Sequence, residues 1–344
     1  MTVDRPLAVG LTPMETRRPV VLRLAQRAEQ LGYHAFYLAE AWGHDATVLL
    51  TEIATRTERI RLGTGVLNIW GRSPASLAML AGTLDDVSGG RFELGLGAGS
   101  PQLAEGLHDA AFRDPVGQLA SVTRQVRGLL AGERLAPSGP REQRPLRLAT
   151  GPRPGLPINV AALGPRAIRV AGELADGWYP FLLPVSGVAA GVALLDDGRR
   201  GAGTPRPRIS PCIPAAVATD PGQARQLASW WVAFYLTSMG PLYPRALRRL
   251  GHGAAVDEVL RANPTRRPAD VPARATQLLD ELTVWGDADT AATALERWYR
   301  AGAELPTLVL PPSRPLAQLE FMLEAMAPAR SGTSAIGALS AAGT

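Results

Sequence analysis

The amino-acid sequence predicts an α/β fold, a (β/α)8 TIM barrel with insertions. Three observations favour this fold class. Short apolar runs alternate with stretches that repeat apolar residues at helical spacing, and the alternation keeps a steady pitch along the chain. The strand-like runs number eight, as a closed barrel of parallel strands requires. A chain of 344 residues is long for one ordinary core, but α/β barrels of this size fold as one domain.

The first half of the chain supplies four pairs of a strand and a helix. The predicted strands are 6–11, 34–40, 60–68 and 91–99, and the helices that follow them are 20–32, 45–57, 73–90 and about 116–130. End residues support these boundaries, because Gly32 is typical of a helix C-terminus and Asp45 and Ser73 are typical N-caps. Pro74 stands at a first helical position, which proline favours.

The second half continues the alternation after a loop rich in proline and arginine at 131–157. The predicted strands are 157–163, 178–182, 208–218 and 305–311, and the predicted helices are 165–177, about 186–200, one from Pro221, 287–302 and 316–326. An irregular stretch at about 237–270 interrupts the pattern. We therefore expect residues 1–328 to form a single barrel domain with an insertion at 237–270, and the small, polar residues 329–344 to form a disordered tail.

Composition excludes several classes of protein. No apolar run reaches the roughly 20 residues of a membrane span, and no signal peptide is recognisable, so we expect a cytoplasmic protein without a membrane partner. The single cysteine, Cys212, lies in an apolar strand and is expected to be core. The four histidines form no metal-binding pattern, and no G-x-S-x-G elbow is present, so no metal site and no serine hydrolase are expected.

The basic character of the chain does not predict a nucleic-acid partner. The net charge is only +5, and the pI near 9.9 partly reflects the high pKa of arginine, because the chain contains no lysine. Basic clusters such as "RALRRLGHG" lack the interleaved aromatic residues of single-strand binders. These clusters are interpreted as solvated helix faces, with the rim of an anionic-ligand site as the alternative.

The stretch "GGRFELGLGAGSP" at 89–101 resembles a phosphate loop only superficially. Neither register of G-x-G-x-x-G is complete, because Ser100 and Gln102 stand where the third glycine belongs, and no Gly-Lys-Ser/Thr follows. The small residues Gly97, Ala98, Gly99 and Ser100 end a predicted barrel strand, where a planar ligand could lie against bare backbone.

Barrels carry their active sites where the strands end, so the residues just after each strand are the candidates. Glu40, Trp42 and His44 follow the second strand, and such side chains can bind and protonate a substrate. Capping and packing are their alternative roles, and Asp45 is expected to cap the next helix. After the fifth strand, Pro165 and Arg166 open a helix whose start suits an anion.

The motifs "AEAWGHDA", "RTERIRLGTGVLN", "RSPASLAM", "SGGRFELGLGAGSPQLAEGLH" and "VAALGPRAIRVAGELADGW" resemble, in order and spacing, the bacterial-luciferase-like superfamily. The match is best to the coenzyme F420-dependent, deazaflavin-using branch related to methylenetetrahydromethanopterin reductase. It covers residues 6–182 with several specific motifs and continues weakly to about residue 326.

The resemblance implies a set of cofactor contacts and catalytic residues. A non-prolyl cis peptide would fall at Gly65–Val66, and Glu40, with Trp42 and His44 beside it, would hold a cofactor hydroxyl or relay a proton. The cofactor contacts would be Gly65, Val66, Asn68, Gly97, Ala98, Gly99, Ser100, Leu163, Gly164, Pro165 and Arg166. The resemblance also implies a homodimer.

Two departures from the family pattern concern the substrate. Ala41 follows Glu40 where many relatives have a histidine, so the usual acid–histidine pair is missing. Thr237 and Ser238 replace two glycines of a "GGMG" segment, so the pocket wall over the cofactor is expected to differ.

The expected function is F420-dependent hydride transfer to or from a small-molecule or peptide substrate. Without the acid–histidine pair, reduction of a C=C or C=N bond is favoured over alcohol oxidation. The all-arginine composition suggests a GC-rich genome, and a role in natural-product or modified-peptide biosynthesis is one hypothesis. The alternatives are an FMNH2-dependent luciferase-like monooxygenase, with FMN as cofactor, and a non-catalytic ligand-binding barrel.

Overall fold

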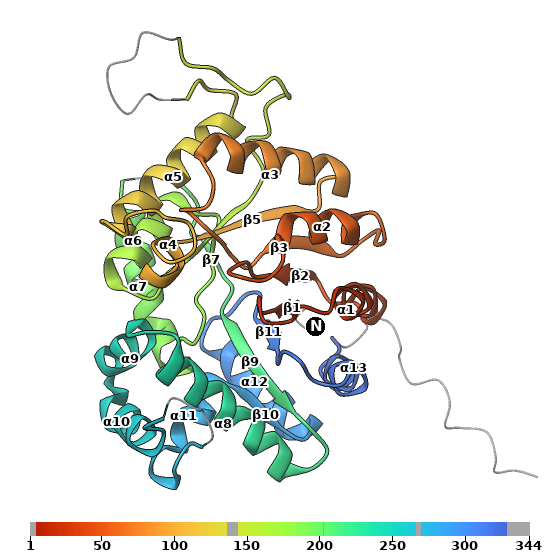
Figure 1. The fold of residues 1–344 in the computed structure, drawn as a ribbon, viewed down its shortest axis with the longest axis vertical. Coiled ribbons are helices and arrows are strands. Elements are labelled where there is room, and N and C mark those ends of the chain that lie inside the picture. Colours follow the sequence, from red (N-terminus) through yellow and green to blue (C-terminus); the bar gives the residue numbers. More distant parts are fainter. Residues whose placement is uncertain (1–4, 136–143, 202, 266–269, 329–344) are drawn as a thin grey trace, which may run out of the picture.

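The computed structural model describes residues 5–135, 144–201, 203–265 and 270–328, and it shows a curled parallel sheet surrounded by helices (Figure 1). The predicted tail at 329–344 lies outside the described residues. The strands are β1 (Ala8–Leu11), β2 (Ala35–Leu38), β3 (Arg61–Thr64), β4 (Leu67–Asn68), β5 (Phe92–Gly97), β6 (Ile158–Ala161), β7 (Gly177–Trp178), β8 (Arg208–Ile209), β9 (Cys212–Val217), β10 (Val284–Gly286) and β11 (Thr307–Leu310).

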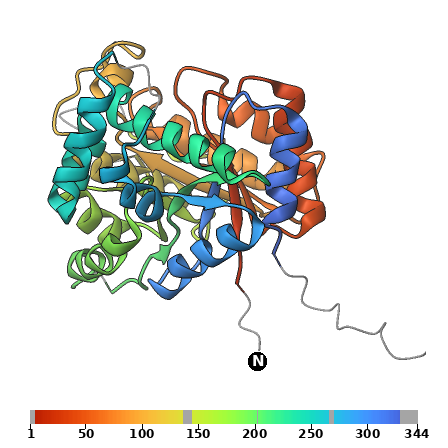
Figure 2. The same cartoon turned by 90° about the horizontal axis from the view of Figure 1, so that it is seen from below.

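Helices connect the strands and cover the outside of the sheet, as the view turned by 90° also shows (Figure 2). The α-helices are α1 (Arg18–Leu31), α2 (Ala46–Ala54), α3 (Pro74–Ser88), α4 (Pro101–Ala104), α5 (Pro115–Leu130), α6 (Pro165–Leu174), α7 (Val188–Gly198), α8 (Pro221–Ser238), α9 (Leu242–Leu247), α10 (Gly253–Ala262), α11 (Gln277–Leu282), α12 (Ala288–Arg300) and α13 (Leu316–Ala325). The strands β1, β2, β5 and β9 are buried along their whole length, as expected of a parallel sheet covered on both faces.

The predicted helix ends are confirmed. Gly32 ends α1 in the left-handed conformation with φ of 85°, and Asp45 accepts hydrogen bonds from two backbone N–H groups at the start of α2. Ser73 caps α3, and Pro74 is its first residue. These ends depend on local chemistry, so sequence reasoning could locate them.

The sheet closes as the prediction of a barrel requires. All strand pairs are parallel, in the order β10-β9-β11-β1-β2-β3-β5-β6-β7-β8, with β4 on β5. Closure occurs beyond β7, where Phe181 pairs with Cys212 and the Cys212 N–H donates to the Pro180 carbonyl at 2.7 Å. The barrel has eight strand positions, here called staves. Six are single strands (β1, β2, β5, β6, β7 and β11), and two are divided strands (β3 with β4, and β8 with β9). The strand β10 pairs with β9 outside these eight.

Three predicted strands are shorter or divided in the structure. The segment 60–68 forms β3 and β4, which the cis peptide Gly65–Val66 separates. The segment 208–218 forms β8 and β9, because Pro211 between them has no N–H to donate. The strand predicted at 178–182 is reduced to β7, followed by Pro180 and by Leu182 at a φ of 54°.

The stretch predicted to be irregular, 237–270, is mostly helical where the structure describes it. It contains α9, a π-helical turn at Arg248–His252 and α10. Aromatic contacts dock it on the barrel, since Tyr243 meets Phe181 and Tyr235 edge to face. These helices are short and contain prolines and glycines, so their apolar residues show no clear helical period. The elements β10 and α11 were not predicted either, because they are also short.

A network of charged and polar side chains joins five staves at the amino-terminal half of the barrel. Glu93 of β5 is 1% exposed and receives hydrogen bonds from Tyr37, Asn159, Arg61 and Arg208, at 2.7, 2.9, 2.7 and 2.6 Å. Burial opposes ionisation of this carboxyl, but the charge of Arg208 and the hydrogen bonds outweigh it and lower the pKa of Glu93 to about 2. The network fills the barrel interior below the carboxyl ends of the strands.

Candidate active site

The segments predicted to carry chemistry meet at one rim of the barrel. Because the strands are parallel, the chain after β2, β4, β5 and β6 emerges at the same edge. Asn68 pairs in register with Gly97, and Gly97 pairs with Ala161 just before the start of α6. The N–H of Glu40 donates to the carbonyl of Val66 at 3.2 Å. Four clusters distant in sequence are therefore neighbours.

Two closely packed glycines lie at the centre of this rim. The Gly65–Val66 bond is cis, where the resemblance implied it. A Cβ on Gly65 would lie 2.9 Å from the Tyr179 hydroxyl, and one on Gly97 would lie 2.7 Å from Cγ2 of Val66. Only glycine fits at these two positions, because the side chains of Tyr179 and Val66 occupy the space that a Cβ would need.

Glu40 is held on two sides. Its carboxylate accepts a hydrogen bond from the Ala46 N–H at 3.0 Å and forms a bidentate ion pair with Arg72. Arg72 also donates to Asp45 at 2.8 Å. The side chains of Glu40 and Arg72 are only 9% and 16% exposed, so the pair fixes the loop after β2 against the loop after β4.

Asp45 has the structural role that was expected of it. Burial opposes its ionisation, but the Thr47 hydroxyl and the Arg72 charge lower the pKa of Asp45 below its ordinary value. An ionised Asp45 caps α2 and completes the clamp on Arg72.

The other two candidates after β2 do not join Glu40. The Trp42 side chain is 55% exposed. The His44 imidazole is exposed, and its Nε2 donates to the carbonyl of Thr16 at 2.8 Å. A Cβ on Gly43 would lie 2.4 Å from the Pro13 carbonyl, so this loop packs on the loop after β1. The contacts found for Glu40 and His44 therefore do not form an acid–base pair.

Asn68 is buried at the end of β4 and uses both ends of its amide. Its Oδ1 accepts from the backbone N–H groups of Trp70 and Gly71 at 3.0 and 2.9 Å. Its Nδ2 lies 3.1 Å from Nε2 of His108, whose ring packs over Gly71. The Trp70 indole donates to the Ala98 carbonyl at 2.7 Å. The loops after β4 and β5 are thus fastened together.

The segment after β5 continues into α4. Gly99 has a left-handed φ of 62°, and Ser100 caps α4 by accepting from the Leu103 N–H at 3.3 Å. A cavity of about 540 Å³ borders this segment at Gln102. Thr237 and Ser238, which replace the family's glycines, line the same cavity; that they form the pocket wall over the cofactor stays a prediction.

The start of α6 presents backbone N–H groups that no side chain caps. Gly164 is the N-cap residue, Pro165 is the first helical residue, and Arg166 pairs with Asp114 at 2.9 Å while remaining 69% exposed. The Leu163 carbonyl accepts a hydrogen bond from Arg249 at 2.6 Å. Positive charge and free amides therefore gather at this point of the rim.

The model of the luciferase-like monooxygenase family matches residues 8–305, a range that includes the whole candidate site. The chain belongs to the luciferase-like monooxygenase family.

Individual relatives agree with this assignment to the luciferase-like family. A Mycobacterium tuberculosis protein named as a coenzyme F420-dependent oxidoreductase is 31% identical over 305 residues, covering 82% of this chain and 88% of that protein. The 5,10-methylenetetrahydromethanopterin reductase of Archaeoglobus fulgidus is 29% identical over 237 residues, covering 67% of this chain and 69% of the reductase. The solved structure of the coenzyme F420-dependent tetrahydromethanopterin reductase of Methanopyrus kandleri shares the fold, with a TM-score of 0.76 at 19% identity over 94% of this chain and 98% of that one.

Sequence reasoning missed three residues of this luciferase-like site: Arg72, His108 and Arg249. Arg72 is a basic residue just after a barrel strand, and His108 follows the glycine stretch, so both carried a weak positional signal. Arg249 belongs to the cluster "RALRRLGHG", for which an anionic-ligand rim was the alternative interpretation. Its contact with Leu163 spans 86 residues and depends on the helical insertion.

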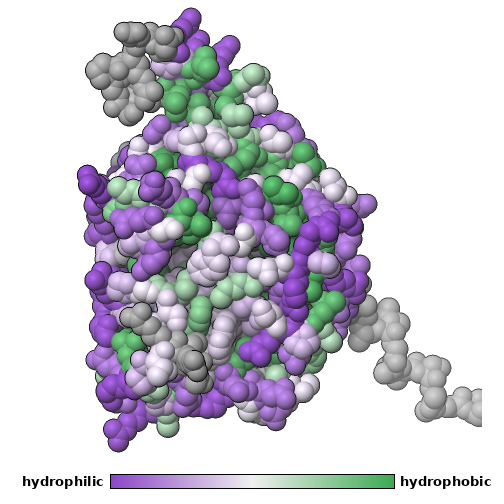
Figure 3. All heavy atoms as spheres, viewed as in Figure 1, coloured by the Kyte–Doolittle hydropathy of each residue, from purple (hydrophilic) through white to green (hydrophobic). Residues whose placement is uncertain are grey.

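Hydrophilic and hydrophobic side chains are intermingled on the face drawn in Figure 3. No helix within the described ranges is both long and apolar enough to span a bilayer. Among those same residues, His, Cys, Asp and Glu side chains nowhere gather in the threes that could hold a metal ion.

Proposed function

We propose that this protein is a coenzyme F420-dependent oxidoreductase that transfers hydride between the deazaflavin and an organic substrate. The observation that carries the proposal is the likeness, over most of both chains, to a relative named as F420-dependent. The small residues Ala98 and Gly99, which follow the end of β5 and are half-buried and exposed respectively, support it, because a planar ring can lie where no large side chain intervenes.

The residues at the rim fit such a cofactor in a second respect. The Thr12 hydroxyl, directly after β1, is buried and has no hydrogen-bond partner among the residues that the structure describes. An unpartnered buried hydroxyl is costly unless a ligand satisfies it. We infer that Thr12 hydrogen-bonds the polar edge of the ring, while main chain near Gly65 and Gly97 supports its face.

The start of α6 suits the cofactor's phosphate. Its first amides are uncapped, and Arg249 lies at the Leu163 carbonyl beside them. Helix amides and a guanidinium both favour a phosphate group. Arg166, already paired with Asp114, adds positive charge at the outer edge.

The contacts of Glu40 favour a positioning role. A carboxylate that Arg72 and the Ala46 N–H hold in place is a fixed hydrogen-bond acceptor for a cofactor or substrate hydroxyl. His44 is occupied by the Thr16 carbonyl. With no free acid–histidine pair to take a hydroxyl proton, reduction of a C=C or C=N bond is better supported than alcohol oxidation. Bound F420H2 supplies the hydride, and one proton completes the reduction.

Titrating the purified protein separately with oxidised F420 and with FMN, followed by ring fluorescence, tests the cofactor. Tight F420 binding with negligible FMN binding is expected. Preference for FMN together with oxygen-dependent product formation would replace the proposal with a luciferase-like monooxygenase. If the protein bound neither F420 nor FMN, a non-catalytic ligand-binding barrel would replace the proposal.

The direction of transfer has its own test. Under anaerobic conditions, F420H2 is mixed with the protein and a panel of unsaturated carbonyls and imines, and oxidised F420 with a panel of secondary alcohols. Return of the oxidised deazaflavin absorbance with the first panel is expected. Bleaching of oxidised F420 with an alcohol would establish the opposite direction.

We also propose that the protein forms a homodimer through α2 and α3. These neighbouring helices leave Val48, Met79 and Val87 exposed. Exposed apolar side chains on adjacent helices favour a protein contact. Sedimentation of the wild type and of a Val48→Glu, Met79→Glu variant tests this, since the variant is expected to sediment as a monomer.

A further inference from the structure

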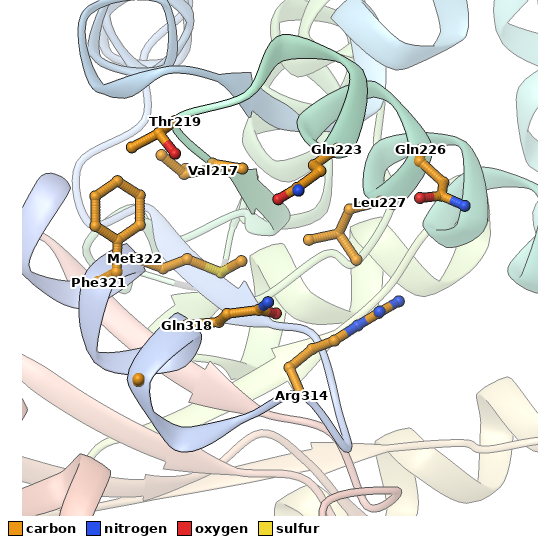
Figure 4. A pocket seen from close by; sticks show the side chains of 11 residues that line it. Val217, Thr219, Gln223, Gln226, Leu227, Arg314, Gln318, Phe321 and Met322 are labelled. Atoms are coloured by element: carbon orange, nitrogen blue, oxygen red, sulfur yellow. The ribbon is translucent and has the colours of Figure 1, made fainter.

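A groove lies between α8 and α13 (Figure 4). Its volume of about 490 Å³ is within the range of small-molecule pockets. It opens where β9 ends at Val217, and residues of the first turns of both helices line it. None of the residues assigned above to the cofactor or the reaction borders it.

The two ends of the groove differ in chemistry. Figure 4 shows Val217, Phe321 and Met322 gathered at one end and Arg314 extending along the other. Gln223 and Gln226 of α8 and Gln318 of α13 also line the groove. The groove therefore offers an apolar wall, three side-chain amides and one guanidinium.

Arg314 is the only charged side chain among the described residues that line the groove. Its guanidinium has no carboxylate partner in the described part of the chain, although most arginines of this protein have one. A half-buried guanidinium next to an apolar wall attracts an anion, and its planar fork matches a carboxylate.

The backbone of Arg314 is fixed by the loop after β1. Its carbonyl accepts from Arg17 at 2.7 Å, and Arg17 is paired with the buried Glu15. Glu15 also accepts from the N–H of Ser313, which has a left-handed φ of 59°. This conformation is uncommon for a residue other than glycine and persists where the surroundings hold it. The loop thus fixes the base of the arginine at the mouth of the groove before any ligand arrives.

We propose that this groove binds a carboxylate with an elongated apolar body. The carboxylate pairs with the Arg314 guanidinium, Gln223 and Gln318 flank the ligand, and its apolar part lies on Val217, Phe321 and Met322. This second ligand site is independent of the reaction proposed above.

Calorimetric titration of the full-length protein with octanoate, octan-1-ol and octylamine tests the charge requirement. Octanoate is expected to bind about tenfold more tightly than either of the others, as one charge-assisted contact implies. Arg314→Gln should remove this preference, and Arg314→Lys should retain part of it. Arg274→Gln, which removes an exposed arginine outside the groove, is the matched control and should behave as the wild type.

The apolar wall is tested by chain length. The wild type should bind octanoate more tightly than butanoate, and Phe321→Ala should reduce that difference while leaving the preference for a carboxylate. Equal binding of octanoate and octan-1-ol, or equal octanoate binding by the Arg314→Gln and Arg274→Gln variants, would overturn the proposal. The proposal would also be overturned if the wild type did not bind octanoate and Arg314→Gln sedimented differently from the wild type. The groove would then be a contact with a second copy of the chain.

Discussion

At the scale of single residues, Asn68 fixes the tautomer of the neighbouring His108 imidazole. Two backbone N–H groups donate to its Oδ1, so its Nδ2 must be the group that faces His108. Because Nδ2 can only donate, Nε2 of His108 accepts, and the proton of the neutral imidazole is on Nδ1. His108 therefore offers the rim a hydrogen-bond donor.

Asn68→Ala is expected to lower the free energy of unfolding by about 1–3 kcal/mol, because it leaves the N–H groups of Trp70 and Gly71 without their acceptor. Asn68→Asp is the matched variant, since it keeps that acceptor but has no donor for His108. Urea denaturation measures stability, and ¹⁵N NMR of the imidazole reports the tautomer. An unaltered His108 spectrum in both variants would contradict the assignment.

Gly97→Ala is expected to cost about 1–3 kcal/mol of stability, because its Cβ would lie 2.7 Å from Cγ2 of Val66. The displaced main chain should also weaken F420 binding. Gly151→Ala is the control, as a Cβ there meets nothing within 4 Å. Thermal unfolding and the fluorescence titration measure the two effects, and equal behaviour of the variants would show that Gly97 tolerates a side chain.

At the scale of elements, the loop after β2 depends on one cation from the loop after β4. Arg72 bridges Glu40 and Asp45, so each loop restrains the other. This clamp joins the start of α2 to the loop after β4. The ion pairs of Arg72 therefore hold the two loops against each other at the rim.

Arg72→Met keeps the apolar stem but leaves Glu40 without its cation. We expect stability to fall by about 1–3 kcal/mol, less than for a fully buried pair because water still reaches this one. The exposed pair of Arg124 and Glu173 is the control, and Arg124→Met should cost less than about 1 kcal/mol. Urea denaturation compares them; equal losses would mean that the clamp is no more than a surface ion pair.

Arg249→Gln is expected to weaken F420 binding about tenfold and to reduce its dependence on salt, because one guanidinium beside the start of α6 is lost. Arg245→Gln, on the exposed side of α9, removes the same charge elsewhere on the insertion. Fluorescence titrations at low and high ionic strength distinguish them. If both variants bind alike, the phosphate lies elsewhere.

At the scale of the whole molecule, Glu93 connects five staves from inside the barrel. Its folded pKa of about 2 lies below the ordinary 4.5, so its ionisation stabilises the fold above pH 4.5. That contribution is lost as the pH falls from 4.5 towards 2. The shift corresponds to about 3 kcal/mol at neutral pH.

Glu93→Gln should therefore be less stable than the wild type by about 3 kcal/mol at pH 7. Its stability should also fall less steeply than that of the wild type between pH 5 and about 2. Glu58→Gln, at an exposed position, should change stability by less than about 0.5 kcal/mol. Urea denaturation across this pH range measures the slopes. Parallel slopes for Glu93→Gln and the wild type would show that the carboxyl does not titrate with unfolding.

The sequence predicted the elements whose signals are local. Asp45, Ser73 and Gly32 end helices through contacts within a few residues, and the β/α alternation gave the barrel. The short helices at 237–270 and the strand β10 were missed, because each is too brief to show a period. Their stability comes from packing, such as Tyr243 against Phe181.

By itself, the sequence determined the fold class, the order of the staves and which segments emerge at the rim. These features follow from hydrophobic period, capping residues and motifs, all of which are readable along the chain. Only the tertiary structure decided which side chains meet: Arg72 with Glu40, His108 with Asn68, Arg249 with the start of α6. Those contacts join residues that are 32, 40 and 86 positions apart, counting Leu163 as the partner of Arg249. Pairing of neighbouring strands brings the loops to one edge, and the side chains that then meet depend on packing between those loops, which no local pattern encodes.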